Sequence, residues 1–199
     1  MYRYFIFLLL ACAIGAEAQK KREIFELESY RHTLNFTDHK LVFQALPSNG
    51  VTLSAVANNK YYWFTGREVR ATQGGYSGKL LHGLYTDYYL NQSLKEQGTF
   101  NLGLKEGTWK AWTEEGVLVS EVHYRAGHAE GKFMLYDQQG RLREIGNYRN
   151  GKVHGAIRKY LSPDSVVTEK YRHGVPKQKN KPWFKKLFKK RANAQGAKP

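Results

Sequence analysis

The sequence has a single cysteine and few acidic residues compared with its basic ones. Its single cysteine, Cys12, allows no intramolecular disulfide, and cleavage after residue 18 would leave a mature chain without thiol chemistry. Seventeen Asp and Glu face 32 Lys and Arg, which gives a formal net charge of +15. There is no G-x-S-x-G motif, no phosphate-cradling glycine loop before a helix and no Asp-rich calcium loop. We therefore predict a protein that is not an enzyme, without a cofactor, a metal or a small-molecule substrate.

The composition favours an all-β protein. Apolar residues make up 41% of the chain and aromatic residues 14%, which is too much for a disordered chain. Tyr occurs 14 times and Gly 19 times, whereas Ala-rich or Leu-rich helical stretches are scarce. Spread glycines and frequent aromatic residues are typical of short strands separated by turns.

Residues 1–18 have the pattern of a secretory signal peptide. Arg3 supplies the positive region, residues 5–14 an apolar run too short for a stable membrane anchor, and Ala16–Ala18 a cleavage site before Gln19. The alternative is a lipoprotein signal with Cys12 acylated, which the short apolar run and Leu10 disfavour. We expect an exported protein in the periplasm or at the outer-membrane periphery of a Gram-negative bacterium, because exported eukaryotic proteins usually carry disulfides.

A period of 24 residues runs through residues 60–176. Glycines recur at positions 83, 107, 131 and 155, and aromatic residues occupy fixed columns between them. Each unit reads as two short strands joined by glycine-containing turns, such as Glu114–Gly116 and Arg125–His128. A lone hairpin cannot bury its aromatic face, so the units must stack into an elongated antiparallel array of β-hairpin repeats. The repeat aromatic residues proposed for packing or binding are Tyr85, Tyr88, Trp109, Trp112, Phe133, Tyr136, Tyr148 and Tyr160.

The spacing Phe133-x-x-Tyr136, Gly140-x-Leu142 and Tyr148-x-x-Gly151 resembles the MORN-type repeat, specifically the variant of YwqK-like antitoxins in exported Bacteroidetes proteins. Gln92 departs from this pattern, because other units have glycine there, and the first unit is shifted around Gly78. The resemblance implies an elongated β array that binds proteins or lipids. The antitoxin label fits poorly with a signal peptide.

Residues 19–59 do not follow the period. Leu41–Leu46 and Val51–Val56, joined by a turn at residues 47–50, predict a β-hairpin. We interpret residues 19–59 as an N-terminal β cap over the first open edge of the array.

Histidines do not indicate a metal site. His82 and His154 stand in one repeat column, where the other units have Glu106 and Glu130. A position that accepts either residue type is expected to be structural or solvated.

Residues 177–199 form a basic tail with nine Lys and Arg and no acidic residue. Helical spacing from Pro182 places apolar and basic side chains on opposite faces, which predicts a short amphipathic helix that folds on contact. Its candidate membrane- or anion-binding residues are Trp183, Phe184, Lys185, Lys186, Leu187, Phe188, Lys189, Lys190 and Arg191. The expected contact is anionic lipid or lipopolysaccharide. Docking on the last repeat, or in a protein groove, is the alternative, and export argues against nucleic acid.

These observations predict a binding or scaffold protein of the cell envelope, whose partner is an envelope protein or an anionic surface. Two other functions fit the same repeats. One is an immunity-type inhibitor of an envelope protein, and the other is a glycan or peptidoglycan binder that stacks sugars on Tyr and Trp.

Overall fold

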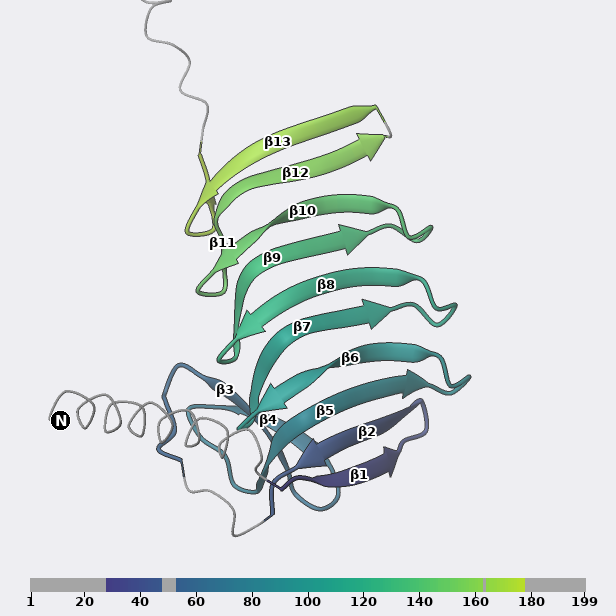
Figure 1. Cartoon of the computed structure of the whole chain (residues 1–199), viewed down its shortest axis with the longest axis vertical. Helices are drawn as coiled ribbons and strands as arrows, with labels where there is room; N and C mark the ends of the chain where they lie inside the picture. Colours follow the sequence, from purple (N-terminus) through teal and green to yellow (C-terminus); the bar gives the residue numbers. More distant parts are fainter. Residues whose placement is uncertain (1–27, 48–52, 163, 178–199) are drawn as a thin grey trace, which may run out of the picture.

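The computed structural model describes residues 28–47, 53–162 and 164–177, and these contain fourteen β-strands and no helix. The strands pair antiparallel in the order β1-β2-β5-β6-β7-β8-β9-β10-β12-β13-β14, with β3, β4 and β11 off this path. The hairpins stack along the long axis of one open, curved sheet (Figure 1). This confirms the predicted all-β repeat fold, whereas the predicted C-terminal helix lies outside the described residues.

Before the regular repeats, the strands are β1 (Tyr30–Asn35), β2 (His39–Ala45), β3 (Lys60–Phe64) and β4 (Val69–Gln73). The repeats contain β5 (Lys79–Tyr89), β6 (Leu94–Asn101), β7 (Leu104–Trp112), β8 (Leu118–Arg125), β9 (His128–Tyr136), β10 (Leu142–Arg149), β11 (Lys152–Val153), β12 (Gly155–Ser162), β13 (Ser165–Arg172) and β14 (Val175–Pro176).

Two kinds of turn alternate along the array, as predicted. At one end of the strands, Ala126-Gly127 and Asn150-Gly151 each have two successive positive φ angles, which is the backbone of a type I′ hairpin turn. At the other end, the Gly116 N–H donates to the Thr113 carbonyl over 3.0 Å and closes a longer turn.

The type I′ turns also join one hairpin to the one before it. The glycine N–H of each turn donates to a strand carbonyl that lies 21 to 22 residues earlier. These bonds run from Gly103 to Leu81 (2.7 Å), Gly127 to Lys105 (3.0 Å), Gly151 to Ala129 (2.9 Å) and Gly174 to Val153 (2.8 Å). The stacking of hairpins is therefore fixed by backbone bonds at one end as well as by strand pairing.

The first predicted unit, residues 60–83, differs from the others. Its β3–β4 hairpin leaves the main path and pairs with β5 only through Trp63↔Leu80 and Phe64↔Lys79. The place before β5 in the main sheet is taken by β2, which pairs with β5 from His39↔Tyr89 to Ala45↔Leu81. The regular period therefore begins at β5.

The N-terminal hairpin also differs from the prediction. β2 does contain Leu41–Ala45, but its partner is β1, with Tyr30↔Ala45 and Asn35↔Lys40 as the outer pairs. Residues 53–56, predicted as the second strand, form no strand. The turn-forming composition of residues 47–50 was therefore not evidence for a hairpin at that point.

The best-buried core lies where the β3–β4 hairpin covers the main sheet. Phe43, Leu81, Phe100 and Trp109 are 3% exposed or less and belong to one cluster with Phe64. A second cluster joins Tyr61, Trp63, Leu80 and Leu46. Because a single-layer sheet leaves both faces open, this covering hairpin provides the burial that the N-terminal part needs.

Candidate binding surface

Strand register divides the eight repeat aromatic residues between the two faces of the sheet. Paired residues share a face and neighbours along a strand alternate. Trp109 pairs with Val122, and Tyr85 with Gly98, on the face that the β3–β4 hairpin covers, which we call the core face. Tyr85, Trp109, Phe133 and Tyr148 lie on the core face, and Tyr88, Trp112, Tyr136 and Tyr160 on the opposite face.

The core-face aromatic residues pack on one another. The rings of Phe100 and Trp109 meet edge to face with centroids 4.8 Å apart, and those of Phe133 and Tyr148 lie 4.7 Å apart. Burial, followed by the nearby Glu96 carboxylate, raises the pKa of Tyr85. These contacts stabilise the array, and of the four residues Trp109 and Phe133 are buried, at 3% and 2% exposed, whereas Tyr85 and Tyr148 are partly buried.

Lys105 adds a cation to this core face. Its Nζ lies 3.7 Å from the centroid of the Trp109 ring and 2.8 Å from Oε1 of Glu96. The ammonium is thus held by a ring face and by a carboxylate at once. Its charge is satisfied within the fold.

The opposite face carries an apolar row that repeats with each hairpin. The aromatic residue near the end of one strand pairs with an aliphatic residue at the start of the next strand. In the first three hairpins, the strand register shifts by one residue directly beside this pair. We call these residues the apolar stripe: Tyr88 with Leu94, Trp112 with Leu118, Tyr136 with Leu142, and Tyr160 with Val166. Because strands lie about 4.8 Å apart, the aromatic rings recur about every 10 Å along the array.

A groove lies at each end of the apolar stripe, one beside Tyr88 and one beside Tyr160. One of about 460 Å³ lies beside Tyr88 and Val42, together with the 64% exposed Leu90. Another, of about 430 Å³, is lined by Leu142, Tyr160 and the 68% exposed Leu161.

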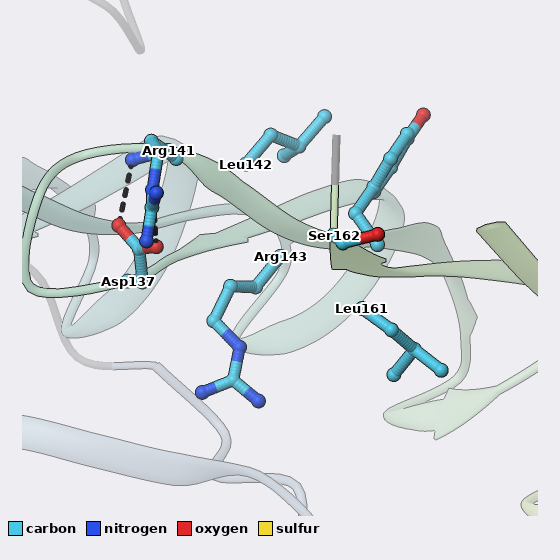
Figure 2. Close-up of a pocket in the computed structure, with 7 residues that line it drawn as sticks. Asp137, Arg141, Leu142, Arg143, Leu161 and Ser162 are labelled. Atoms are coloured by element: carbon cyan, nitrogen blue, oxygen red, sulfur yellow. Dashed lines mark hydrogen bonds and ion pairs between the residues drawn. The ribbon is translucent and has the colours of Figure 1, made fainter. Parts of the chain in front are cut away.

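Two arginines border the second groove and differ in their contacts. Figure 2 shows dashed contacts joining Asp137 and Arg141, which include a 2.8 Å bond from Arg141 Nε to Asp137 Oδ2, and none from Arg143 to the residues drawn. These bonds, led by the one from the Arg141 backbone N–H, lower the pKa of Asp137. Arg143 forms no ion pair with a described residue, and in Figure 2 its side chain points to the opposite side of the ribbon from that of Leu142.

The carboxylates of the stripe face are already engaged by the fold. Glu121 lies 3.5 Å from Lys110 and accepts a 2.9 Å hydrogen bond from the Tyr136 hydroxyl. Burial and this bond to Glu121 raise the pKa of Tyr136. Further along the same face, the strand cations without an ion pair to any described residue include Lys132, Arg158, Lys170 and Arg172. The C-terminal half of the stripe face therefore has an excess of positive charge.

The His/Glu column has the structural role predicted for it in three of four units. In each, the side chain accepts a hydrogen bond from the first residue of the type I′ turn that follows. The bonds run from the Leu102 N–H to His82 Nδ1 (3.2 Å), from the Ala126 N–H to Glu106 Oε2 (2.8 Å) and from the Asn150 N–H to Glu130 Oε2 (2.7 Å). Either residue type supplies an acceptor there, which explains their exchange. Burial lowers the pKa of His82 and keeps its ring neutral.

Two observations concern other kinds of site. Among the described residues, no group of three or more His, Cys, Asp or Glu is placed to hold a metal ion. In residues 28–47, 53–162 and 164–177, no helix is long and apolar enough to cross a membrane.

The remaining predicted residues lie outside the described part of the chain. These are the cleavage-site residues Ala18 and Gln19, and the tail residues Trp183, Phe184, Lys185, Lys186, Leu187, Phe188, Lys189, Lys190 and Arg191. Conversely, the sequence interpretation missed Leu94, Leu118 and Leu142 as surface residues, although their 24-residue spacing was visible.

A family model described as a MORN repeat variant matches residues 105–126. The match covers β7, β8 and the turn between them, which is one regular hairpin of the array. It supports a MORN-type repeat here and favours a non-catalytic binding repeat. Comparison with curated proteins gave no significant match, and neither did comparison with solved structures.

Proposed function

We propose that this protein is a non-enzymatic binding or scaffold protein that holds an acidic, partly apolar protein segment along its apolar stripe. The observation that carries the proposal is the repetition of one aromatic–aliphatic pair on four successive hairpins of the open face. Such a row offers several equivalent contacts to an extended partner, which is how repeat arrays usually bind.

The charge around the apolar stripe supports an acidic partner. Arg158 lies two residues from Tyr160 in β12, on the same face, and Lys132 lies on this face in β9. Neither has an ion pair among the described residues, whereas Glu121 is occupied by Lys110 and Tyr136. Carboxylates of a partner would form ion pairs with these cations, and the complementary charges would increase the association rate.

We extend the proposal to the location and the tail. The signal-like residues 1–18 support export to the periplasm, and the amphipathic pattern of residues 182–191 supports a second contact, with anionic lipid or lipopolysaccharide. The protein would then hold its partner near a membrane. We also propose that the protein is related to the YwqK-like proteins of Bacteroidetes.

Two adjacent valines give a matched test of the apolar stripe. Val166 is 47% exposed and pairs with Tyr160 on the stripe face, whereas Val167 is 41% exposed and pairs with Lys159 on the core face. We expect the full chain to recover a protein partner from cell envelopes by cross-linking, Val166→Glu to lose most of it, and Val167→Glu to retain it. Equal recovery with both variants would refute binding through the apolar stripe.

The tail requires a separate experiment. Replacing Lys185, Lys186, Lys189 and Lys190 with Gln should release the protein from membrane fractions while leaving the recovered partner unchanged. If the partner disappears together with the membrane association, the tail and not the apolar stripe carries recognition. An anionic glycan recovered in place of a protein would support the glycan-binding alternative.

A further inference from the structure

In the last unit, the side chain of the His/Glu column accepts no hydrogen bond from the N–H of the following turn. His154 stands where Glu106 and Glu130 accept a hydrogen bond from a turn N–H, but its Nδ1 is buried without a partner. The following turn comes one residue early, so that its first residue is His173, whose ring lies 5.2 Å from that of His154. No hydrogen bond from the His173 N–H to a side chain occurs within the described residues.

Cations surround this position and lack carboxylates. A pocket of about 260 Å³ is lined by His154, Lys170, Arg172 and Lys177, together with Gly155, Ala156 and Tyr171. Arg149 lies close enough to act on the His154 ring. None of Arg149, Lys170, Arg172 and Lys177 forms an ion pair with a residue that the structure describes.

We propose that this pocket is an oxyanion site that takes a phosphate or sulfate group where the two preceding units have a glutamate carboxylate. The chain itself gives the precedent, since a carboxylate oxygen at the equivalent position accepts a turn N–H over 2.7 to 2.8 Å. A tetrahedral oxyanion has enough acceptors for a turn N–H and for several cations at once. The site is separate from the apolar stripe and does not depend on the function proposed there.

The state of His154 supports this assignment. Burial, and then Arg149, His173, Arg172 and Lys177, lower the pKa of His154. An anion bound among these cations would reverse their effect and favour the imidazolium, which also donates a hydrogen bond to it. Occupancy of the site therefore has a direct signature in the titration of one ring.

The test is an NMR titration of the histidine rings in the full chain, with sodium phosphate and with sodium chloride at matched ionic strength. Phosphate should raise the pKa of His154 in a saturable way, while chloride should not. The His82 ring, which stands in the same column but is bonded to the Leu102 N–H, is the internal control and should not respond. Equal shifts with the two salts would overturn the proposal.

Two variants separate the site from a general effect of positive charge. His154→Glu supplies the missing carboxylate and should abolish phosphate binding while the fold is retained. Arg172→Gln should weaken phosphate binding at least tenfold, and Lys110→Gln, on the stripe face but paired to Glu121, should leave it unchanged. Because His154→Glu lacks the reporting ring, phosphate binding to each variant is measured by isothermal titration calorimetry. Unaltered phosphate affinity of His154→Glu and Arg172→Gln would overturn the site.

The source of the phosphate group is distinguished with vesicles. A site for headgroup phosphates predicts that wild-type protein sediments with phosphatidylglycerol vesicles more strongly than His154→Glu does, with free phosphate competing. A site for a soluble oxyanion predicts equal sedimentation of both proteins, with phosphate still raising the pKa of His154 in the wild type. Absence of both effects would show that no oxyanion site exists.

Discussion

Replacing Gly98 with Ala should destabilise the array, because the Trp109 ring lies directly against that glycine. A Cβ built at Gly98 would come within 2.7 Å of Cγ of Trp109 and closer still to two other ring atoms, so the ring must move. It has little freedom to do so: Trp109 is 3% exposed, and its Nε1–H donates to the Thr99 carbonyl over 3.2 Å.

The size of the effect follows from two opposing contributions. Forcing one extra carbon into a packed core costs about 1–3 kcal/mol of unfolding free energy. Alanine recovers about 0.5–1 kcal/mol, because glycine loses more backbone entropy in a strand. We therefore expect a net loss of roughly 1–2 kcal/mol, which corresponds to a drop of about 0.5–1 M in the urea midpoint.

The assay is urea unfolding followed by circular dichroism, with two controls. Gly75→Ala makes the same substitution where a Cβ would meet nothing within 4 Å, and should change the unfolding free energy by less than about 0.5 kcal/mol. In a Trp109→Leu background, Gly98→Ala should cost much less than in the wild type, giving a measurable coupling energy. If Gly98→Ala is as neutral as Gly75→Ala, or costs the same with and without the indole, the packing argument is wrong.

Three further predictions concern the His/Glu column and the open end of the array. Glu130→Ala removes the bond to the Asn150 N–H and should lower the unfolding free energy by about 1 kcal/mol in the same urea assay. Because the pKa of His82 is lowered in the folded state, the unfolded ring binds its proton first as the pH falls. Stability should then decrease below pH about 6.5, and His82→Gln should flatten the decrease between pH 7.5 and 5.5. Burial raises the pKa of Asp87 in the folded state, so the folded protein binds this proton first as the pH falls. Protonation of Asp87 should therefore increase the stability as the pH decreases towards about 3.9, which is opposite to the effect of His82. Hydrogen exchange should be faster in β12 and β13 than in β5 and β6, and equal protection of the two hairpins would contradict this.

The repeat period predicted the regular part of the fold because each repeated residue has a local reason. Ala126-Gly127 and Gly116 occupy turns that need positive φ angles, and the turns then determine which strands pair. The period alone did not separate core from surface. Trp109 and Trp112 looked equivalent in the sequence, but they are three residues apart in one strand and face opposite sides.

The N-terminal part was harder to predict because its pairings are not local. Residues 60–83 keep aromatic residues in the repeat columns, as Tyr61 and Phe64 show, yet their hairpin folds over the core face. The pairing of β2 with β5 joins residues that lie 36 to 50 positions apart, from Ala45↔Leu81 to His39↔Tyr89, and nothing in a hairpin pattern indicates it. Likewise, the missing hydrogen bond at His154 can be recognised only by comparison with the bonds that His82, Glu106 and Glu130 accept in the other three units.

The array is therefore asymmetric, and the asymmetry bears on function. Among the described residues beyond Trp109, the buried apolar side chains are Phe133 and Ile157, and no second layer covers them. The same hairpins hold the cations without ion pairs, and clustered like charge opposes a compact state. An anion that binds only the folded array would offset this repulsion and stabilise the C-terminal hairpins by mass action. Binding and folding of these hairpins should consequently be coupled more strongly than those of the covered N-terminal part, which needs no ligand to complete its packing.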